Sequence, residues 1–175
     1  MMEEFPDVAR NCERLLGSRG FPCVIRMLPG GVSIRPERGI QKCDLSVLDG
    51  LPVKELDLAN MEVVDLSPLS DLRLSSLSLR GAPVKDLTPL AGLPLKNLDL
   101  ALTRVETLEG LEASPLSRLV LRSTKIAHLE PVEEAPIHEL DLALTPIESL
   151  RSLRQMPLRS LDLFKAAVAD IGPLR

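Results

Sequence analysis

The chain has 175 residues and a formal net charge of −4, and 45% of its residues are hydrophobic, which is enough apolar material for the core of one domain. Its 21 Lys and Arg residues are interspersed with 25 Asp and Glu residues and only 2% of its residues are aromatic, so it offers nucleic acid neither a basic stripe nor stacking side chains. No apolar run approaches the roughly 18 residues of a membrane span, and the acidic N-terminus lacks the apolar segment of a secretion signal, which predicts a cytoplasmic protein without membrane contact.

Residues 1–50 differ in pattern from the rest of the chain. Apolar residues at helical spacing predict an amphipathic helix over about residues 5–16. Two alternating runs on either side of a Pro-Gly-Gly turn predict a β-hairpin over about residues 23–36. The sequence DLSVLDG at 44–50 then matches the tail of the repeats that follow. We therefore expect the segment to be an N-terminal cap that covers the apolar end of the first repeat.

The three cysteines, Cys12, Cys23 and Cys43, all lie in this cap and show no Cys-x-x-Cys spacing. We favour buried free thiols, because disulfides are rare in the cytoplasm, and a disulfide between Cys12 and Cys23 is the alternative. Zinc is disfavoured because the two histidines, His128 and His138, are distant in the chain and belong to different repeats.

From residue 51 to 175 the chain repeats itself every 21 residues, in six units. Each unit contains a Leu-x-Leu pair, and alternation around this pair predicts a short strand whose leucines face the core. The identical sequences LDLALT at 98–103 and 140–145 therefore mark every second strand. The first leucines of the six pairs are Leu56, Leu77, Leu98, Leu119, Leu140 and Leu161.

Three further apolar columns follow each strand, represented in the first unit by Val63, Leu66 and Leu69. The spacing of three between the last two columns fits one helical or 3₁₀ turn. Ser67 and Thr88 each stand directly before a proline, which predicts that their hydroxyl groups cap this turn. One coil is therefore a strand, a bend, a single turn and a return, and only stacking of coils can bury its leucines.

These columns resemble the leucine-rich repeat LxxLxLxxNxL, which LKNLDLALTRV and IHELDLALTPI match. The elements VVDLSPL and AGLPLKNL are similar to the bacterial class of 21- to 22-residue repeats, shared by internalins, phosphatase-regulator repeats and the repeats attached to bacterial protein kinases. The resemblance covers residues 51–175. It implies an α/β fold, a right-handed solenoid with a parallel β-sheet on its concave face and short 3₁₀ turns on its convex face, and it implies binding of other proteins.

The chain departs from this repeat at the position of its Asn, whose side chain bonds backbone groups of adjacent coils. Thr can make part of that bond, whereas Met and Ala can make none. We therefore expect the turns with Met and Ala to satisfy their backbone in another way, such as with water. The six residues at this position are Met61, Ala82, Thr103, Thr124, Thr145 and Ala166.

The exposed positions of the strands provide the candidate protein-binding residues. Neighbouring strands lie roughly 4.8 Å apart, so we expect Arg80 to reach Asp57 or Asp99, and Arg122 to reach Asp99 or Asp141. These charges form either a solvated face that satisfies itself or a recognition surface for a partner with acidic and basic groups. The candidate residues are Asp57, Arg80, Asp99, Arg118, Val120, Arg122, Glu139, Asp141, Asp162 and Phe164.

The sequence shows no converging nucleophile, base and oxyanion donor, so we expect no enzyme, no cofactor and no metal site. The last unit reaches Arg175 without a polar capping segment, although terminal repeats normally carry one. Two hypotheses follow: the chain forms a homodimer through this open end, with the strand edge and Phe164 in the contact, or it is one portion of a larger polypeptide. The predicted function is a module that binds another protein through the concave face or the open end. The alternative is a regulatory or scaffolding subunit or domain of a kinase or phosphatase system.

Overall fold

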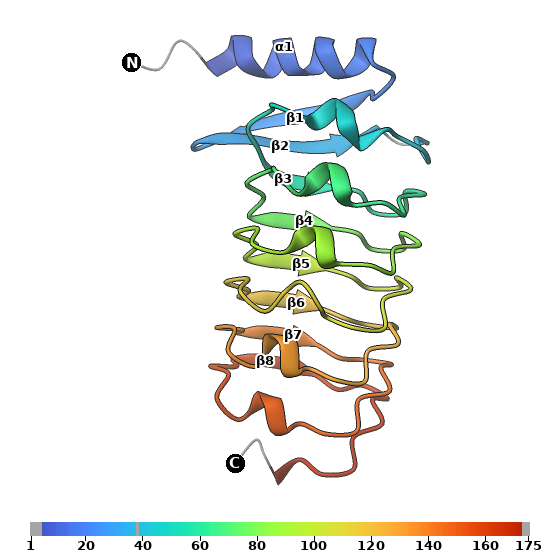
Figure 1. Ribbon diagram of the computed structural model, residues 1–175, viewed down its shortest axis with the longest axis vertical. Helices are drawn as coiled ribbons and strands as arrows, with labels where there is room; N and C mark the ends of the chain where they lie inside the picture. Colours follow the sequence, from blue (N-terminus) through green and yellow to red (C-terminus); the bar gives the residue numbers. More distant parts are fainter. Residues whose placement is uncertain (1–4, 38, 173–175) are drawn as a thin grey trace.

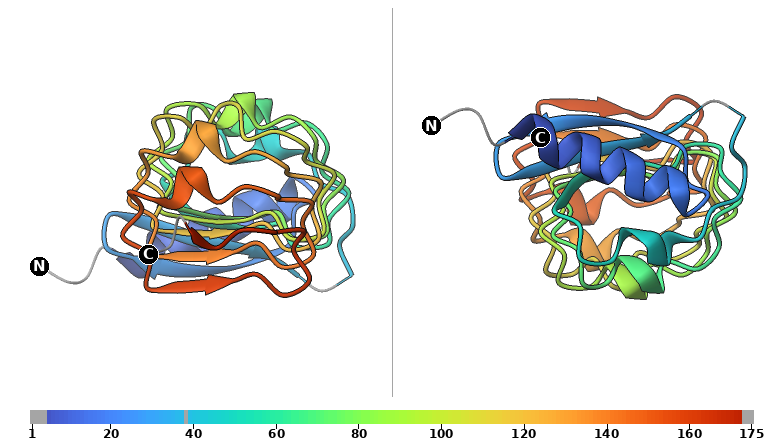
Figure 2. Two further views of the ribbon diagram at one scale, coloured as in Figure 1. Left: turned by 90° about the horizontal axis from the view of Figure 1, so that it is seen from below. Right: turned by 90° about the horizontal axis from the view of Figure 1, so that it is seen from above.

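A computed structural model describes residues 5–37 and 39–172. They form a stack of coils in which an eight-stranded sheet occupies one side and short 3₁₀ turns occupy the opposite side (Figures 1 and 2). The strands follow one another across the sheet in chain order, from β1 to β8. The solenoid predicted from the 21-residue repeat is therefore confirmed. No helix within the described ranges is both long enough and apolar enough to cross a membrane.

The stack begins with helix α1 (Phe5–Ser18), which ends two residues beyond its predicted end. It is followed by the antiparallel strands β1 (Cys23–Leu28) and β2 (Gly31–Pro36), on the residues predicted for the hairpin. β2 also pairs in parallel with β3 (Val53–Asp57). The 3₁₀ turn η1 (Leu45–Leu48) lies in the chain between these two strands. Together β2 and η1 form a coil of their own, of which only the tail was predicted. The division between cap and repeats at residue 50 stays a prediction.

The hairpin turn is held tightly against the first repeat. The Val32 amide donates to the Pro52 carbonyl oxygen at 2.9 Å. A Cβ atom on Gly31 would lie 2.3 Å from the same oxygen, so any larger residue would push the two segments apart. The glycine therefore allows β2 to pair closely with β3.

All three cysteines are free thiols, so the alternative of a Cys12–Cys23 disulfide is not formed. Cys12 and Cys23 are buried as predicted, whereas Cys43 is only half-buried. Burial raises the pKa of the Cys23 thiol to about 11, and it does the same for Cys43.

The repeat strands are short, parallel and in register, and leucine stands next to leucine from coil to coil. The Leu-x-Leu side chains from β3 to β7 are at most 3% exposed, which confirms that they face the core. Only the last pair, Leu161 and Leu163, is half-buried. The strands after β3 are β4 (Ser76–Ser78), β5 (Asn97–Asp99), β6 (Arg118–Val120), β7 (Glu139–Asp141) and β8 (Ser160–Asp162).

The other apolar columns complete the core. The columns that begin with Val63, Leu66 and Leu69 are buried through the first five repeats, as predicted. Leu174, the last member of the third column, lies outside the described residues. A further apolar column lies three residues before the first leucine of each Leu-x-Leu pair, and in the first five repeats its side chains are at most 1% exposed. Its members are Val53, Leu74, Leu95, Leu116 and Ile137.

The 3₁₀ turns that begin at Ser67 and Thr88 are capped by aspartates, so the prediction that the hydroxyl groups of these two residues cap the turns was wrong. Ser67 and Thr88 are already the first residues of their turns, and their amides donate to Oδ1 of Asp65 and Asp86 at 2.8 and 2.9 Å. Bonds from the Ser67 side chain and backbone hold the pKa of Asp65 below its ordinary value. The turns of the repeats are η2 (Ser67–Leu69), η3 (Thr88–Leu90), η4 (Glu130–Val132) and η5 (Arg151–Leu153).

The third repeat has no 3₁₀ turn in its described residues, although one was predicted for every coil. Gly110 occupies the place of the turn's proline and adopts a φ of 97°, a conformation that proline cannot reach. A Cβ atom there would lie 2.7 Å from the Leu87 carbonyl oxygen of the coil before. The glycine thus replaces the turn with a closer approach between two coils.

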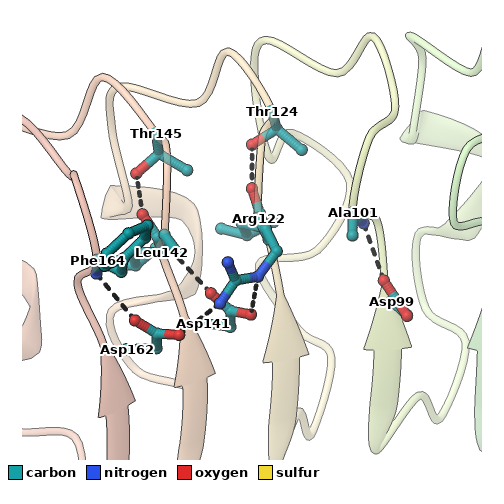
Figure 3. Close-up of polar contacts among 11 residues, drawn as sticks. Asp99, Ala101, Arg122, Thr124, Asp141, Leu142, Thr145, Asp162 and Phe164 are labelled. Atoms are coloured by element: carbon teal, nitrogen blue, oxygen red, sulfur yellow. Dashed lines mark hydrogen bonds and ion pairs between the residues drawn. The ribbon is translucent and has the colours of Figure 1, made fainter.

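The turns after the strands satisfy their backbone within their own coil. Thr103 Oγ1 donates to the Leu100 carbonyl at 2.7 Å, and Thr124 and Thr145 make the same bond (Figure 3). Where Met61, Ala82 or Ala166 replaces threonine, the residue's own amide donates to the equivalent leucine carbonyl at 2.9 to 3.2 Å. The amides of Thr103, Thr124 and Thr145 make the same bond, so it is common to all six turns, and the alternative expected for the Met and Ala turns stays a prediction. The threonine hydroxyls add a second bond to the same acceptor.

Candidate protein-binding face

The sheet face, meaning the outward side of β3 to β8 and of the residues that directly extend them, holds the predicted site. A shallow groove of about 280 Å³ runs across its C-terminal half. Asp57, Arg122 and Phe164 lie outside its lining. The predicted site residues that line the groove are Arg80, Asp99, Arg118, Val120, Glu139, Asp141 and Asp162.

Arg122 joins three strands of this face. It lies two residues beyond the end of β6, and its Nε lies 2.9 Å from Oδ2 of Asp141 in β7. Its Nη2 contacts Oδ2 of Asp162 in β8, so the guanidinium lies between the two carboxylates (Figure 3). The predicted contact with Asp141 is present, while that with Asp99 is absent and Asp162 was not predicted. The hydrogen bond to Asp141 is the largest of the causes that raise the pKa of Arg122 above its ordinary value.

The contact with Asp162 has an electrostatic reason. Asp141 and Asp162 are register partners in neighbouring strands, so their backbones lie roughly 4.8 Å apart and their like charges repel. The alternation of Asp with other residues from strand to strand ends here. A guanidinium with several donors can neutralise both carboxylates at once, and this arrangement outweighs a contact with Asp99 alone.

The aspartates of the sheet face have a second role, which the sequence analysis missed. Oδ1 of Asp99 accepts a hydrogen bond from the Ala101 amide at 2.9 Å, and Asp57, Asp141 and Asp162 accept the equivalent bond. This is an Asx-type turn that ends β3, β5, β7 and β8. The sequence Asp-x-Ala, which recurs at the ends of the first three of these strands, was the signal for it. One carboxylate oxygen therefore holds the backbone, and the other can face a neighbour or a partner.

Arg80 makes no ion pair within the described part of the chain, so the prediction that it reaches Asp57 or Asp99 was wrong. Asp57 is paired instead with Arg35 of β2, whose Nε lies 3.0 Å from Oδ2. Ile34 is the register partner of Leu56, so the next residue, Arg35, stands opposite Asp57. Asp99 likewise has no ion-pair partner among the residues that the structure describes.

A second ion pair lies inside the groove. Arg118 Nη1 lies 2.8 Å from Glu139 Oε2, and both side chains are more than half exposed. Val120 is half-buried and lies in the chain between Arg118 and Arg122. The groove therefore combines the apolar residues Leu119, Val120 and Leu140, an exposed ion pair, and two groups of opposite charge that have no ion-pair partner among the described residues.

The remaining predicted features lie away from the groove. His128 is exposed, and His138 lies 3.4 Å from Ser117 Oγ through its Nδ1. Within residues 5–37 and 39–172, no three His, Cys, Asp or Glu side chains gather as a metal-binding group.

The C-terminal end of the stack is open in its described part. Leu158, Leu161, Leu163 and Val168 are half-buried and Ile171 is 59% exposed. In the preceding coil the equivalent side chains are at most 3% exposed. A row of apolar side chains that is buried elsewhere is therefore accessible here, next to the unpaired edge of β8.

Comparison with known proteins supports the fold. No protein-family model and no curated protein matches the sequence. Among solved structures, an internalin from Listeria monocytogenes is similar with a TM-score of 0.70 and 24% identity, over 77% of this chain and 42% of the internalin. Internalin C2 from the same organism is similar with a TM-score of 0.64 and 28% identity, over 69% of this chain and 56% of its own. The chain thus spans about half the length of these structures. The chain therefore has a leucine-rich-repeat solenoid fold, similar to that of these two internalin structures.

Proposed function

We propose that the protein is a binding module whose partner protein occupies the groove of the sheet face. The observation that carries the proposal is that side chains from β4 to β8 converge on this groove, while Arg80 and Asp99 have no ion-pair partner among the residues that the structure describes. A partner with one acidic and one basic group would pair with both. The solenoid holds these residues at fixed spacing, so the groove requires little ordering on binding.

The ion pairs of the face are compatible with this role. Exposed ion pairs contribute only about 0–1 kcal/mol, because water solvates both charges well. The Arg118–Glu139 pair can therefore open at little cost and re-form with groups of a partner. The solvated interpretation and the binding interpretation of the face differ only in whether a partner exists, so the decisive measurement is one of binding.

The experiment reverses the polarity of one ion pair without removing it. In Arg118→Glu/Glu139→Arg the pair can re-form, so the fold is retained while a partner meets the opposite charges. The matched control is Lys42→Glu/Glu62→Lys, which reverses an exposed pair of 3.2 Å far from the groove. We expect affinity purification from the native host to recover a partner with the wild type and the control but not with the groove variant. Equal recovery by all three proteins would place binding elsewhere.

The open end supports a second candidate, which is self-association. Leu158, Leu161 and Leu163 leave apolar surface accessible beside a strand edge that could pair with a second copy. Light scattering tests this, and a monomeric mass at high micromolar concentration would contradict it. A regulatory role in a kinase or phosphatase system, a cytoplasmic location and the absence of catalysis stay predictions from the sequence.

A further inference from the structure

The turns that follow β4 to β8 form a second surface beside the groove, which we call the turn edge. It comprises residues 80–83, 101–104, 122–125, 143–146 and 164–167. The hydrogen-bond ladder of the sheet continues through it, since each of the first four turns donates one amide to the next coil at 2.8 to 2.9 Å. Neighbouring turns therefore keep the spacing of the strands. The bonds run from Gly81 to Ala101, Leu102 to Arg122, Ser123 to Ala143, and Leu144 to Phe164.

One position of each turn adopts a positive φ, and leucine occupies it twice. Asn60 (φ 62°) and Gly81 (φ 72°) are residue types that tolerate this left-handed conformation. Leu102 and Leu144 adopt the same conformation, at 62° and 60°, with 52% and 44% of their surface exposed. The left-handed conformation is sterically unfavourable for leucine, and burying only about half of the side chain stabilises the protein by little more than this steric cost. Stability alone therefore gives no reason to prefer leucine over asparagine, which points to an interaction.

The two leucines belong to an apolar line. Phe164 is 58% exposed, and the bond from the Leu144 amide to its carbonyl places it in the neighbouring coil. Leu102 lies two coils from Leu144, which is roughly 10 Å at the spacing of parallel strands. The coil between the two leucines carries Ser123, a small polar residue, at the equivalent position. Ala101 and Ala143, which directly precede the leucines, are fully buried.

All charged residues of the turn edge are positive, and only the turn 143–146 carries no charge. Its residues include no Asp or Glu, and its cations are Arg80, Arg104, Arg122, Lys125 and Lys165. Arg122 and Lys125 are engaged by carboxylates that lie outside the turn edge. Arg80 and Arg104 have no ion-pair partner among the described residues, and Lys165 Nζ lies 5.3 Å from the centre of the Phe164 ring. A ligand of the edge would therefore meet exposed apolar groups flanked by unpaired positive charge.

We infer that the turn edge binds an acidic segment of a partner protein that carries large apolar side chains. The apolar side chains would pack on Leu102, Leu144 and Phe164, while carboxylates would pair with Arg80 and Arg104. The inference rests on the proposed function in requiring a protein partner, and it adds the chemistry of that partner and a second contact surface. An anionic membrane would meet the same groups, but the net charge of −4 of the whole chain opposes adsorption to a negative surface.

The test uses the full chain and a phage-displayed library of random peptides. We expect selection on the immobilised wild type to enrich peptides that combine an excess of Asp and Glu with at least one large apolar residue. The edge variant Leu102→Asn/Leu144→Asn places the residue type of position 60 at both leucine positions, so its fold is retained. Its affinity for the selected synthetic peptide, measured by fluorescence anisotropy, should fall at least about tenfold, the effect of losing about 1.4 kcal/mol.

The controls separate this inference from the proposed function. Val24→Asn/Val64→Asn removes similarly exposed apolar side chains elsewhere and should leave peptide affinity unchanged. A peptide that binds the edge variant as tightly as the wild type but is lost on Arg118→Glu/Glu139→Arg would overturn the inference and leave the proposed groove standing. Absence of acidic, apolar peptides from the selection would also overturn it. So would leucine-dependent sedimentation with vesicles of phosphatidylcholine and phosphatidylserine, which would assign the edge to a membrane.

Discussion

Because Arg122 contacts two aspartates, we predict that Asp162→Asn changes stability in opposite directions with and without the Arg122 side chain. In Arg122→Gln, the carboxylates of Asp141 and Asp162 remain neighbours without a cation between them. Two unit charges roughly 4.8 Å apart repel by about 0.9 kcal/mol at the dielectric constant of water and by about 3.5 kcal/mol at an effective value of 20. Because both carboxylates are partly exposed, with side-chain exposures of 23% and 43%, we expect a value near the lower limit.

Asp162→Asn measures this repulsion because asparagine keeps an oxygen for the hydrogen bond from the Phe164 amide, at 2.8 Å in the wild type. In the wild type the substitution should destabilise the protein. Asp162 is closer to Arg122, which attracts it, than to the carboxylate of Asp141, which repels it, so the attraction that is lost exceeds the repulsion that is relieved. In the Arg122→Gln background it should stabilise the protein by about 1 kcal/mol, because only the repulsion is removed. High salt should shrink this gain.

Urea unfolding followed by circular dichroism would provide the four stabilities of the double-mutant cycle. Hydrogen exchange should place the loss in Arg122→Gln at the last coil, where the Leu142 and Leu144 amides bond to carbonyls of the next strand and turn. The matched control is Arg118→Gln, because Glu139 has Ser160 rather than a carboxylate as its other register partner. If Asp162→Asn has the same sign in both backgrounds, the account of Arg122 as a clamp is refuted.

Three further predictions test the core, one buried hydroxyl and the thiols. Leu119→Ala, at a fully buried position, should destabilise by about 2–5 kcal/mol, and Leu161→Ala in the half-buried last strand by less than half of that, both measured by urea unfolding. The Ser114 hydroxyl is buried without a hydrogen-bond partner among the described residues, so Ser114→Ala should raise the free energy of unfolding by about 1 kcal/mol, and a loss of stability would reveal a partner. Because burial raises the pKa of Cys23 and Cys43 from 9.0 to about 11, folding favours the protonated thiols. Their contribution to stability should be complete below pH 9 and lost as the pH rises to about 11, and alkylation below pH 9 should be slower than in urea.

The features of the fold that could be predicted from the sequence are those that recur in all six repeats. A single Leu-x-Leu pair is weak evidence for a strand, but the same pair at a constant interval fixes register as well, because stacking requires identical positions to meet. The failures concern single coils. Gly110 removes one 3₁₀ turn from the pattern, and Arg35 reaches Asp57 because the hairpin strand extends the sheet. Neither event recurs, so no periodic pattern could indicate it.

The caps were predictable from the sequence but were assigned to the wrong residue. The motif Asp-Leu-Ser/Thr precedes the turns after Asp44, Asp65 and Asp86, and each aspartate accepts the amide two residues later. An ionised carboxylate accepts such a bond more strongly than a hydroxyl does. The proline after Ser67 or Thr88 suggests that the turn begins at the proline and that the hydroxyl before it is the cap. The turn in fact begins at Ser67 or Thr88 itself, so the cap lies further upstream.

The two identical LDLALT segments show where local sequence stops being informative. In both, Oδ1 of the aspartate accepts the amide two residues later, at 2.9 Å, so this bond follows from the six residues themselves. The other oxygen behaves differently, because Arg122 stands between Asp99 and Asp141 and contacts only the latter. Arg122 contacts Asp141 because Asp162, two strands away from Arg122, adds its negative charge to that of Asp141 on the same side. Asp99 therefore has no ion-pair partner among the described residues, and this difference between the two copies comes from the non-local part of the structure, not from the six residues themselves.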